Sequence, residues 1–576
     1  MAIQAVSSQL NNMITPHLVQ LCVHGHFYQP PREDPFVGTI PIEFGAEPFQ
    51  NFNEKINAEC YQPNALAGNF ERISFNFGPT LAAWLEGYDP ATYERIIASD
   101  RANFERFGYG NALAQVYNHA IAPLGRPQDT RLQIEWGIAD FEQRFRHRPD
   151  GMWLAETGCN TQVLQMLAEA GIKFTILAPW QADTATIQTL DPTDRAQLQT
   201  KLKAARQSRA EADVVHFQAI LRQHDQLNAH DQLRYAEALK LFYKPSATSV
   251  AEPYRTSEPY LVELANGHSI TVFFYNGHLS SSISFDTQAT TNADNFAQHW
   301  LLPCVENDKL RQRQPQLLLI ATDGELYGHH QPQRELFLQY LTRVSAKHVG
   351  MEVTFLRHYL EQNPPQRCIQ IVDDTSWSCH HGVKRWSTGC ECTWGNASWK
   401  KHLRGAFDTL ASAADVIFEH EGTRLFRDNQ AALCDFIHVW AGRENEAEFL
   451  ARHLKARYRE TRHAVSPLAL RLLRSQMYKH QMYTSCAFYF EDIDRIEPKN
   501  ALAAAAITLR LLGRLASSGL RQQFRDELAQ AHSQRPSHLT GLQLFLRGER
   551  QAGRITVQNR VAAENSEPIN SDKIDA

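Results

Sequence analysis

Two acidic side chains, each closing an apolar run, are the residues of this sequence best suited to chemistry. Glu156 ends the segment GMWLAE, and Asp323 ends the run LLLIATD. Glycosyl transfer needs such a pair, because one carboxylate attacks or stabilises an anomeric carbon while a second, protonated acid donates to the leaving oxygen. Helix capping or ion pairing is the alternative role for each acid. The pair suggests paired-carboxylate chemistry.

Both acids are expected at the carboxyl ends of strands that alternate with helices. Residues 151–178 are predicted to form a strand, a helix that begins at Thr161 and is closed by Gly171, and a second strand. The same order recurs at residues 316–356. Strands alternating with helices indicate a parallel α/β architecture, and in a closed α/β barrel the active site lies at the carboxyl ends of the strands.

A further strand, predicted at Leu18–His26, ends in two histidines. His24 and His26 are two residues apart and therefore share one face of the strand. A loop rich in proline and glycine follows at residues 30–48. Because loops after strands often carry function, we interpret the two rings as lining a pocket, with satisfied core imidazoles as the alternative.

The chain of 576 residues is long enough for two to four domains. Residues 1–375 are predicted to form a barrel with a helical insertion at about 183–255, where His224 and His230 are expected to be solvated helix residues. Amphipathic Ala/Leu/Arg-rich segments predict an α-helical domain at 376–564, and residues 565–576 are expected to be disordered.

The composition is that of an ordinary globular protein, with 43% hydrophobic and 21% charged residues and a formal charge of -5. It carries no electrostatic signature of nucleic-acid or anionic-membrane binding. No apolar run approaches the roughly 18 residues of a membrane span, and the N-terminus lacks the features of a signal peptide. We therefore expect a cytoplasmic protein with reduced cysteines, and the sequence does not determine its oligomeric state.

The segments around the two acids resemble the motifs of glycoside hydrolase family 57. GMWLAETGCNTQVLQMLAEAG is similar to the nucleophile motif, and the resemblance assigns that role to Glu156. TDGELYGHH is similar to the proton-donor motif, which assigns Asp323. VHGHFYQP resembles the first motif, so that His24 and His26 would contact sugar, and NALAQVYNHAIAPL resembles the second, which assigns His119.

The resemblance covers about residues 18–360 and implies an α/β fold, an incomplete (β/α)7 barrel followed by a helical C-terminal domain. Beyond residue 360, TSWSCHHGVKRWSTGCECTWG is similar to an uncharacterised C-terminal domain of a bacterial subgroup of the family. Glu325 and His329 are expected to orient Asp323, and Trp386 to stack on a sugar or to pack against protein. The complete set of expected substrate-binding residues is His24, His26, His119, Trp153, His278, Glu325, His329 and Trp386.

The mechanism implied is retaining. Ionised Glu156 attacks the anomeric carbon while protonated Asp323 donates to the glycosidic oxygen, and Glu325 or an apolar wall raises the pKa of Asp323. No metal or other cofactor is expected. The resemblance implies an α-glucan substrate, such as glycogen or maltooligosaccharides, and leaves amylase, 4-α-glucanotransferase and branching activities open.

Two other function classes remain open. A metal-dependent deacetylase or mannosidase-like hydrolase could use His24 and His26, although the first strand ends without an aspartate and no H-x3-H partner is evident. A non-catalytic glucan-binding protein is the other alternative. The cluster of Cys379, His380, His381, Cys390 and Cys392 is dense enough for zinc but lacks the usual C-x2–4-C spacing, which favours a packing role.

Overall fold

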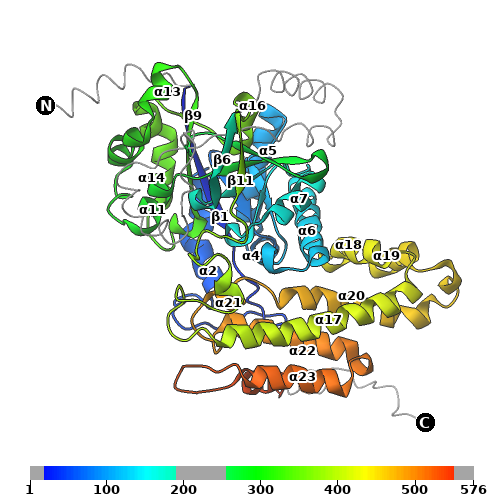
Figure 1. The fold of residues 1–576 in the computed structure, drawn as a ribbon. Helices are drawn as coiled ribbons and strands as arrows, with labels where there is room; N and C mark the ends of the chain where they lie inside the picture. Colours follow the sequence, from blue (N-terminus) through cyan, green and yellow to red (C-terminus); the bar gives the residue numbers. More distant parts are fainter. Residues whose placement is uncertain (1–17, 190–253, 551–576) are drawn as a thin grey trace, which may run out of the picture. The chain divides into compact units, whose positions relative to one another are not determined.

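The computed structural model describes residues 18–189 and 254–550 of the chain, which divides into two compact units (Figure 1). Unit 1 consists of Met1–Pro30 and Glu43–Val383, and unit 2 of Pro31–Ile42 and Lys384–Ala576. The sequence placed a boundary at 375/376 and did not anticipate that Pro31–Ile42 belongs with the C-terminal helices.

Seven parallel strands form the frame of unit 1. They follow one another round a ring in which β1 pairs with both β2 and β9, β3 with β2 and β4, and β5 with β8. Two neighbouring pairs of strands meet through short contacts. A single bridge between Gly151 and Phe174 joins β4 to β5, and a hydrogen bond of 2.7 Å from Asn276 N to Leu319 O joins the end of β8 to β9. This ring confirms the predicted incomplete (β/α)7 barrel. Its strands are β1 (Val19–Phe27), β2 (Ser74–Phe77), β3 (Ala112–Gln115), β4 (Met152–Trp153), β5 (Phe174–Leu177), β8 (Ser269–Phe274) and β9 (Gln316–Asp323).

The strands are apolar because a parallel sheet covered by helices is buried on both faces. Every residue of β1 is buried, and one core cluster includes Cys22, Phe174, Leu319 and Leu356. The long apolar runs of the sequence therefore became the central strands, as predicted.

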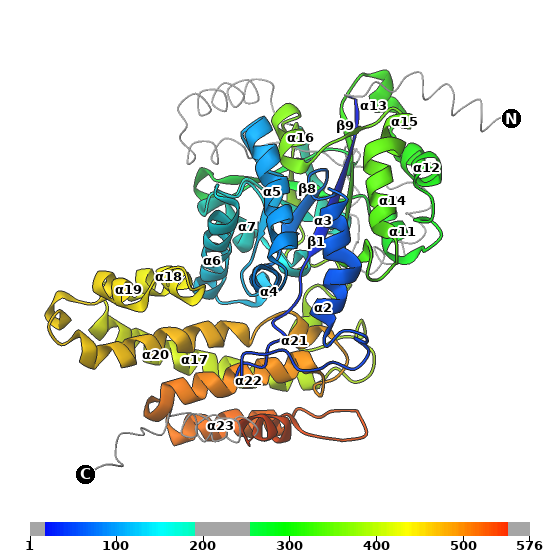
Figure 2. The same cartoon turned by 180° about the vertical axis from the view of Figure 1, so that it is seen from behind.

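Helices cover the outside of the ring (Figures 1 and 2). Helix α7 (Thr161–Glu169) illustrates the local rules, because the Asn160 side chain accepts a hydrogen bond of 2.9 Å from Val163 N and so caps its start. The other helices of eight or more residues in the described part of unit 1 are α4 (Pro79–Tyr88), α5 (Pro90–Phe107), α6 (Pro127–Phe145) and α11 (Gly277–Phe285). Shorter helices include α2 (Phe52–Ile56), α3 (Gln62–Leu66), α12 (Ala293–Phe296), α13 (Asn307–Arg311), α14 (Arg334–Tyr340), α15 (Ala346–His348) and α16 (Leu356–Gln362).

Additional strands extend the sheet at β8 and at β1. β7 (Tyr260–Glu263) pairs antiparallel with β8, β11 (Arg367–Ile371) pairs with β7 and with β6 (Ala182–Thr189), and β10 (Glu352–Val353) pairs with β1. The start of the expected helical insertion is therefore a strand. In ADTATIQT, alternation with β-branched threonine and isoleucine favours extended backbone. The remainder of that insertion, with His224 and His230, lies outside the described residues, as do residues 565–576.

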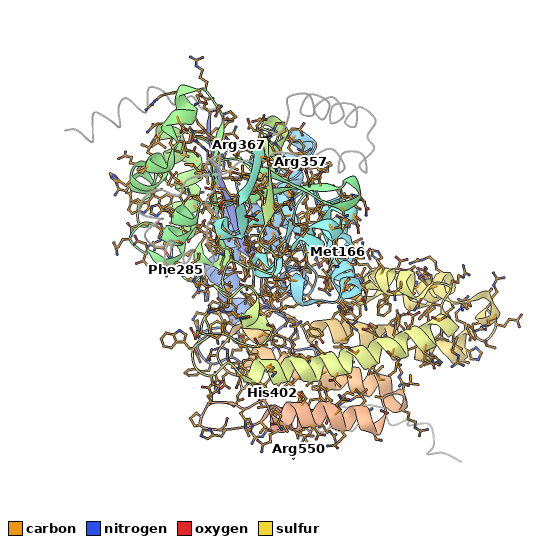
Figure 3. All side chains as sticks on the ribbon, in the orientation of Figure 1. Met166, Phe285, Arg357, Arg367, His402 and Arg550 are labelled. Carbon is orange, nitrogen blue, oxygen red and sulfur yellow. The ribbon has the colours of Figure 1, made fainter. Side chains whose placement is uncertain are left out.

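A buried ion-pair cluster fixes the start of β4. Asp150 receives Arg357 Nε at 3.0 Å and also pairs with Lys173, which precedes β5 (Arg357 is labelled in Figure 3). Burial alone would raise the pKa of Asp150, but Lys173 and Arg357 lower it to about 2. The ionised carboxylate therefore ties β4, β5 and α16 together beneath the strand that leads to Glu156.

Unit 2 is helical, as predicted for the C-terminal region. Helices α17, α20 and α22 pack side by side, and α23 packs on α17 (Figures 1 and 2). Alanines in α22, such as Ala501 and Ala505, are buried and allow close approach between helices. The helices are α17 (Trp399–Leu425), α18 (Asn429–Trp440), α19 (Glu446–His453), α20 (Arg462–Gln481), α21 (Cys486–Tyr489), α22 (Ile496–Leu512) and α23 (Ser518–Ala529).

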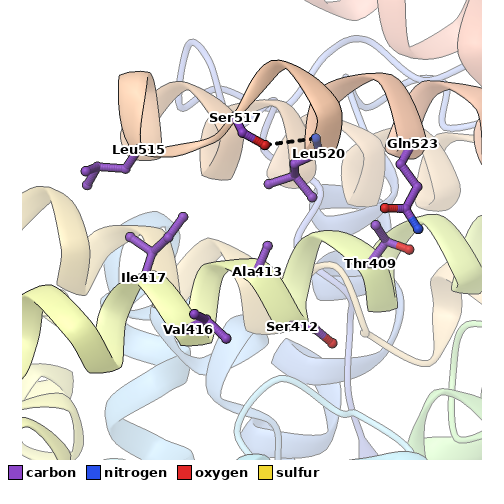
Figure 4. A pocket seen from close by; sticks show the side chains of 9 residues that line it. All are labelled: Thr409, Ser412, Ala413, Val416, Ile417, Leu515, Ser517, Leu520 and Gln523. Atoms are coloured by element: carbon purple, nitrogen blue, oxygen red, sulfur yellow. Dashed lines mark hydrogen bonds between the residues drawn. The ribbon is translucent and has the colours of Figure 1, made fainter.

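A hollow of about 570 Å³ lies between α17 and the segment that leads into α23 (Figure 4). Its lining is mostly apolar and includes Ile417 and Leu520, with Val416 70% exposed at its edge. No helix among the described residues is both long enough and apolar enough to span a membrane.

Candidate active site

Glu156 lies in a strained turn directly after β4. One 3-10 turn, Ala155–Thr157, follows the strand, and Glu156 and Thr157 have φ angles of 56° and 50°. Left-handed backbone at a residue other than glycine costs on the order of 1–3 kcal/mol and persists only where the surroundings impose it. Gln181 supplies that restraint, since it accepts from Thr157 Oγ1 at 2.8 Å and donates to Thr157 O at 2.9 Å.

Two donors bind the carboxylate of Glu156. Trp377 Nε1 and Ser378 Oγ donate to its Oε2 at 2.9 and 2.6 Å. Trp377 N also donates to the backbone oxygen of Glu156 at 3.0 Å. These contacts are possible because Cys159 and Thr375 form an antiparallel bridge that lays the later segment beside the turn. These donors orient the carboxylate, and hydrogen bonds to the charged form of a carboxyl group favour that form.

Asp323 ends β9, in register with His26 of β1. Its side chain is open to solvent on one side. Within residues 18–189 and 254–550, no donor binds its carboxyl group. Burial among the surrounding protein, followed by the negative charges of Glu325 and Glu156, raises its pKa to about 8. The exposed side chain is screened by solvent, so about 8 is the upper limit for the pKa of Asp323.

Glu325 is a buried carboxyl group two residues after Asp323. It accepts hydrogen bonds from Tyr61 Oη at 2.7 Å and from Tyr28 N at 3.2 Å. Burial raises its pKa to about 7, although the bonds from Tyr61 and Tyr28 oppose the shift. Its charge is one cause of the raised pKa of Asp323.

Three buried histidines line the ring beside these acids. His26 Nε2 lies 3.2 Å from His119 Nε2, and Asn76 lies 3.1 Å from His26 Nδ1 and 3.3 Å from His24 Nε2 through its Oδ1. Burial lowers the pKa of His24 to about 3 and that of His26 to about 4, and it lowers the pKa of His119 well below its ordinary value. All three rings are therefore neutral near pH 7.

Aromatic rings pack on these histidines. Trp153 stacks on His24 and His26 with ring centroids 5.0 and 4.9 Å apart, and Tyr28 stacks on His119 at 3.9 Å. Trp377 meets Trp153 edge-on at 5.0 Å. The indole of Trp153 is fully buried, and its N–H has no acceptor in the described part of the chain.

Three further residues that were expected to bind substrate lie in different surroundings. His329 lies 2.6 Å from Glu59 through its Nδ1, an interaction that competes with any contact to Asp323. His278 is half-buried at the start of α11, just after the Asn276 bond to β9. Trp386 is fully buried in the core of unit 2, with Tyr489 at 6.3 Å, so its indole packs against protein and presents no face to a sugar. The binding role given to Trp386 is corrected to packing.

His24 and His26 belong to no cluster of potential metal ligands among residues 18–189 and 254–550. The barrel histidines therefore do not resemble the ligand set that a metal-dependent hydrolase requires.

Sequence reasoning missed Trp377 and Ser378 as partners of Glu156, and Asn76 and Tyr61 as partners of the histidines and Glu325. The stretch TSWSCHH was noted for its likeness to a C-terminal domain and for its cysteine and histidines, and nothing in its spacing indicates contact with β4. A polar residue in the apolar segment ISFNF was the available signal for Asn76.

Comparison with known proteins agrees with this geometry. Residues 94–198 and 229–372 match glycosyl hydrolase family 57, and residues 394–565 match a domain of unknown function (DUF3536). The chain is 28% identical over 106 residues to alpha-amylase 1 of Dictyoglomus thermophilum, a match that spans 18% of this chain and only 15% of that amylase.

Two solved structures share the fold at low sequence identity. An exo-type maltose-forming amylase from Pyrococcus sp. ST04 superposes with a TM-score of 0.61 at 15% identity, covering 89% of this chain and 83% of that one. A family 57 branching enzyme from Thermococcus kodakaraensis gives a TM-score of 0.52 at 13% identity, covering 91% and 96%. The barrel region of this chain, over residues 94–198 and 229–372, is therefore similar to glycosyl hydrolase family 57.

Proposed function

We propose that this protein is a retaining carbohydrate-active enzyme that cleaves or transfers α-glucosidic bonds, with Glu156 as nucleophile and Asp323 as general acid and base. The observation that carries the proposal is the contrast between the two carboxyl groups. Donors from Trp377 and Ser378 stabilise the anion of Glu156, whereas burial and neighbouring charge hold the proton on Asp323. A nucleophile and an acid need those opposite states.

In the first step, Glu156 attacks the anomeric carbon and the glycosidic bond breaks. Asp323 gives its proton to the departing oxygen, so the leaving sugar departs as a neutral alcohol. Esterification of Glu156 removes one of the negative charges that raise the pKa of Asp323, so that pKa falls. Asp323, which has given up its proton, therefore stays ionised and can act as a base. In the second step it deprotonates water or a sugar hydroxyl, which attacks the glycosyl ester from the opposite face.

A carbohydrate substrate suits the rest of the site. Neutral His24, His26 and His119 add no charge beside the two acids, which suits an uncharged sugar. The two structural relatives are described as a maltose-forming amylase and a branching enzyme, which supports an α-glucan in particular. Glycogen and maltooligosaccharides are therefore the substrates to test first, with water and a sugar hydroxyl as the two possible acceptors.

The decisive experiment compares Glu156→Ala and Asp323→Ala in the presence of azide, using an activated α-glucosyl donor. With Glu156→Ala, azide takes the place of the nucleophile and should give a glycosyl azide of inverted configuration. With Asp323→Ala, azide should attack the glycosyl-enzyme and give a product of retained configuration.

Glu105→Ala, which removes an exposed carboxylate of α5, serves as the matched control and should behave as wild type. Identical glucan product profiles for wild type, Glu156→Ala and Asp323→Ala would overturn the catalytic assignment. Products from maltooligosaccharides then distinguish hydrolysis, which releases reducing sugar, from transfer, which lengthens or branches the chain without net release.

A further inference from the structure

The side chain of Gln181 joins the turn that carries Glu156 to the donor segment, residues 372–378, which carries the two donors to Glu156. We infer that Gln181 is a positioning residue, which sets the distance between the nucleophile carboxylate and the N–H and O–H groups that orient it. The inference rests on the proposed function, because it concerns the nucleophile of that reaction. Gln181 ends the 3-10 turn Pro179–Gln181, just after β5, and it is fully buried.

The amide of Gln181 spends its hydrogen-bonding capacity on three segments of unit 1. Its Oε1 accepts from Thr157 Oγ1 and from Ala178 N, both at 2.8 Å. Its Nε2 donates to Thr157 O at 2.9 Å and to Thr375 O at 3.2 Å. A backbone N–H can only donate and a carbonyl oxygen can only accept, so these partners fix which way the amide points. Two donor hydrogens and two acceptor lone pairs are all that an amide offers, and all are used here.

Further bonds tie the same turn to the donor segment. Val372 N donates to Gln181 O at 2.8 Å, and Trp180 Nε1 donates to Ser376 O at 2.9 Å. The bond from Gln181 Nε2 to Thr375 O lies between these two points in the sequence. The chain is therefore held at three places just before it reaches the two donors to the nucleophile.

Gln181 adds a restraint that the antiparallel bridge between Cys159 and Thr375 does not supply. The bridge keeps the two segments adjacent, with Cys159 N donating to Thr375 O at 3.0 Å. Thr157 has a φ of 50°, and such backbone persists only where its surroundings impose it. Gln181 binds both the hydroxyl group and the carbonyl of Thr157 while it also binds Thr375. Removing this amide should leave the chain folded through the bridge but let the Glu156 carboxylate shift away from its donors.

The first test is Gln181→Met, which keeps the length of the side chain and removes its four hydrogen bonds. We expect kcat on maltooligosaccharides to fall by about 10²-fold, because a displacement of about 1 Å at a reacting group can cost that much. KM should change little, since Gln181 is fully buried. The acidic limb of kcat/KM should move to higher pH, because displaced donors favour the ionised carboxylate of Glu156 less. A purely structural role would lower thermal stability without moving that limb.

Gln181→Glu is the conservative variant and adds a pH dependence of its own. When protonated, the new carboxyl group can accept from Thr157 Oγ1 and Ala178 N and donate to one backbone oxygen. When ionised, it would place a negatively charged oxygen against the carbonyl oxygens of Thr157 and Thr375, which repel it. The ratio of kcat for Gln181→Glu to kcat for wild type should therefore fall as the pH rises. At acidic pH this variant should exceed Gln181→Met in kcat by about tenfold, which corresponds to one hydrogen bond.

Gln316→Met is the matched control, at the opposite end of β9 from Asp323. Gln316 is also fully buried, and its amide accepts from Glu306 N at 2.8 Å and donates to Glu306 O at 3.3 Å. Its loss should lower the Tm, as the loss of Gln181 does, but kcat and the acidic limb should stay as in wild type. Thermal unfolding and pH profiles of the three variants provide the measurement.

Three outcomes would overturn the positioning role of Gln181. They are a wild-type kcat and acidic limb in Gln181→Met, an equal loss of kcat in Gln316→Met, and a kcat ratio for Gln181→Glu that does not change with pH. If Gln181→Met fails to fold, the pH dependence of Gln181→Glu decides. A wild type without activity on any α-glucan would refute the proposed function and this inference with it. An active wild type that tolerates Gln181→Met would refute the inference alone.

Discussion

Glu156 and Asp323 end two strands of the same ring, yet the regions around them differ in one decisive respect. The Glu156 region supplies hydrogen-bond donors, from Trp377 Nε1 and Ser378 Oγ. The Asp323 region supplies burial and a second carboxyl group, Glu325, and no donor among the described residues. Two similar side chains are thus given different protonation states by their neighbours, which is how one site can hold both a nucleophile and an acid at the same pH.

The strongest test of this contrast removes the charge at Glu156. Glu156→Gln keeps the shape and the hydrogen-bonding capacity but cannot form a glycosyl ester. We expect kcat on maltooligosaccharides to fall by about 10⁴-fold or more, whatever the leaving group. Steady-state rates on a natural and an activated donor provide the measurement. Activity of Glu156→Gln close to that of wild type on either substrate would contradict the proposed role of Glu156 as nucleophile.

Substitution at Asp323 should differ in its dependence on the leaving group. Asp323→Asn removes the proton donor, and loss of general acid catalysis costs about 10²–10⁴-fold. Formation of the glycosyl-enzyme from a donor with an acidic leaving group needs no protonation, so that step should stay close to the wild-type rate. Pre-steady-state kinetics would show a burst followed by slow turnover. An equal loss for good and poor leaving groups would contradict the assignment.

A smaller effect is expected from the donors to Glu156. Ser378→Ala removes one bond to a charged group, worth about 1.5–3 kcal/mol when buried, and the Trp377 bond remains, so we expect kcat/KM to fall about tenfold. The pKa of Glu156 should rise, because its anion loses a stabilising donor, and the acidic limb of kcat/KM should move to higher pH. Ser376→Ala, which removes a nearby hydroxyl that donates to Gly382 O, provides a control. If the acidic limb of kcat/KM does not move in Ser378→Ala, the hydrogen bond from Ser378 to Glu156 has no influence on the ionisation of Glu156.

The smallest effect concerns pH dependence at the other acid. Because the pKa of Asp323 is raised to about 8, the protonated acid is lost above that value and kcat/KM should fall on an alkaline limb near or below pH 8. Glu325→Gln removes a negative charge that holds the proton on Asp323. The pKa of Asp323 should therefore fall and the limb should move to lower pH, by about one unit or less. A limb that moved upward would show that Glu325 acts in another way.

The sequence predicted the frame of the molecule and the ends of its key strands. A short apolar run such as LLLIA, set between segments of helical pattern, favours a buried strand, so the position of Asp323 at a strand end followed from local pattern. The contacts of Glu156 did not, because Ser378 reaches it only through the bridge between Cys159 and Thr375. Long-range pairing of this kind has no signature in local periodicity.

Burial of single aromatic residues was equally inaccessible to sequence reasoning. Trp386 and Trp394 lie in one short aromatic stretch, but the first is fully buried and the second is 89% exposed. Their difference depends on how helices of unit 2 pack, and neither composition nor spacing records it. The assignment of Trp386 to substrate binding failed for that reason.

The left-handed backbone of Glu156 and Thr157 has a consequence for laboratory evolution. Glycine or asparagine adopts this conformation more readily than glutamate, so replacing Glu156 with either would relieve strain. A library selected only for resistance to heat should therefore enrich these substitutions of Glu156, and each such clone would have lost the proposed nucleophile. At this position stability and activity are under opposing selection, and thermostabilisation of the protein has to begin elsewhere in the chain.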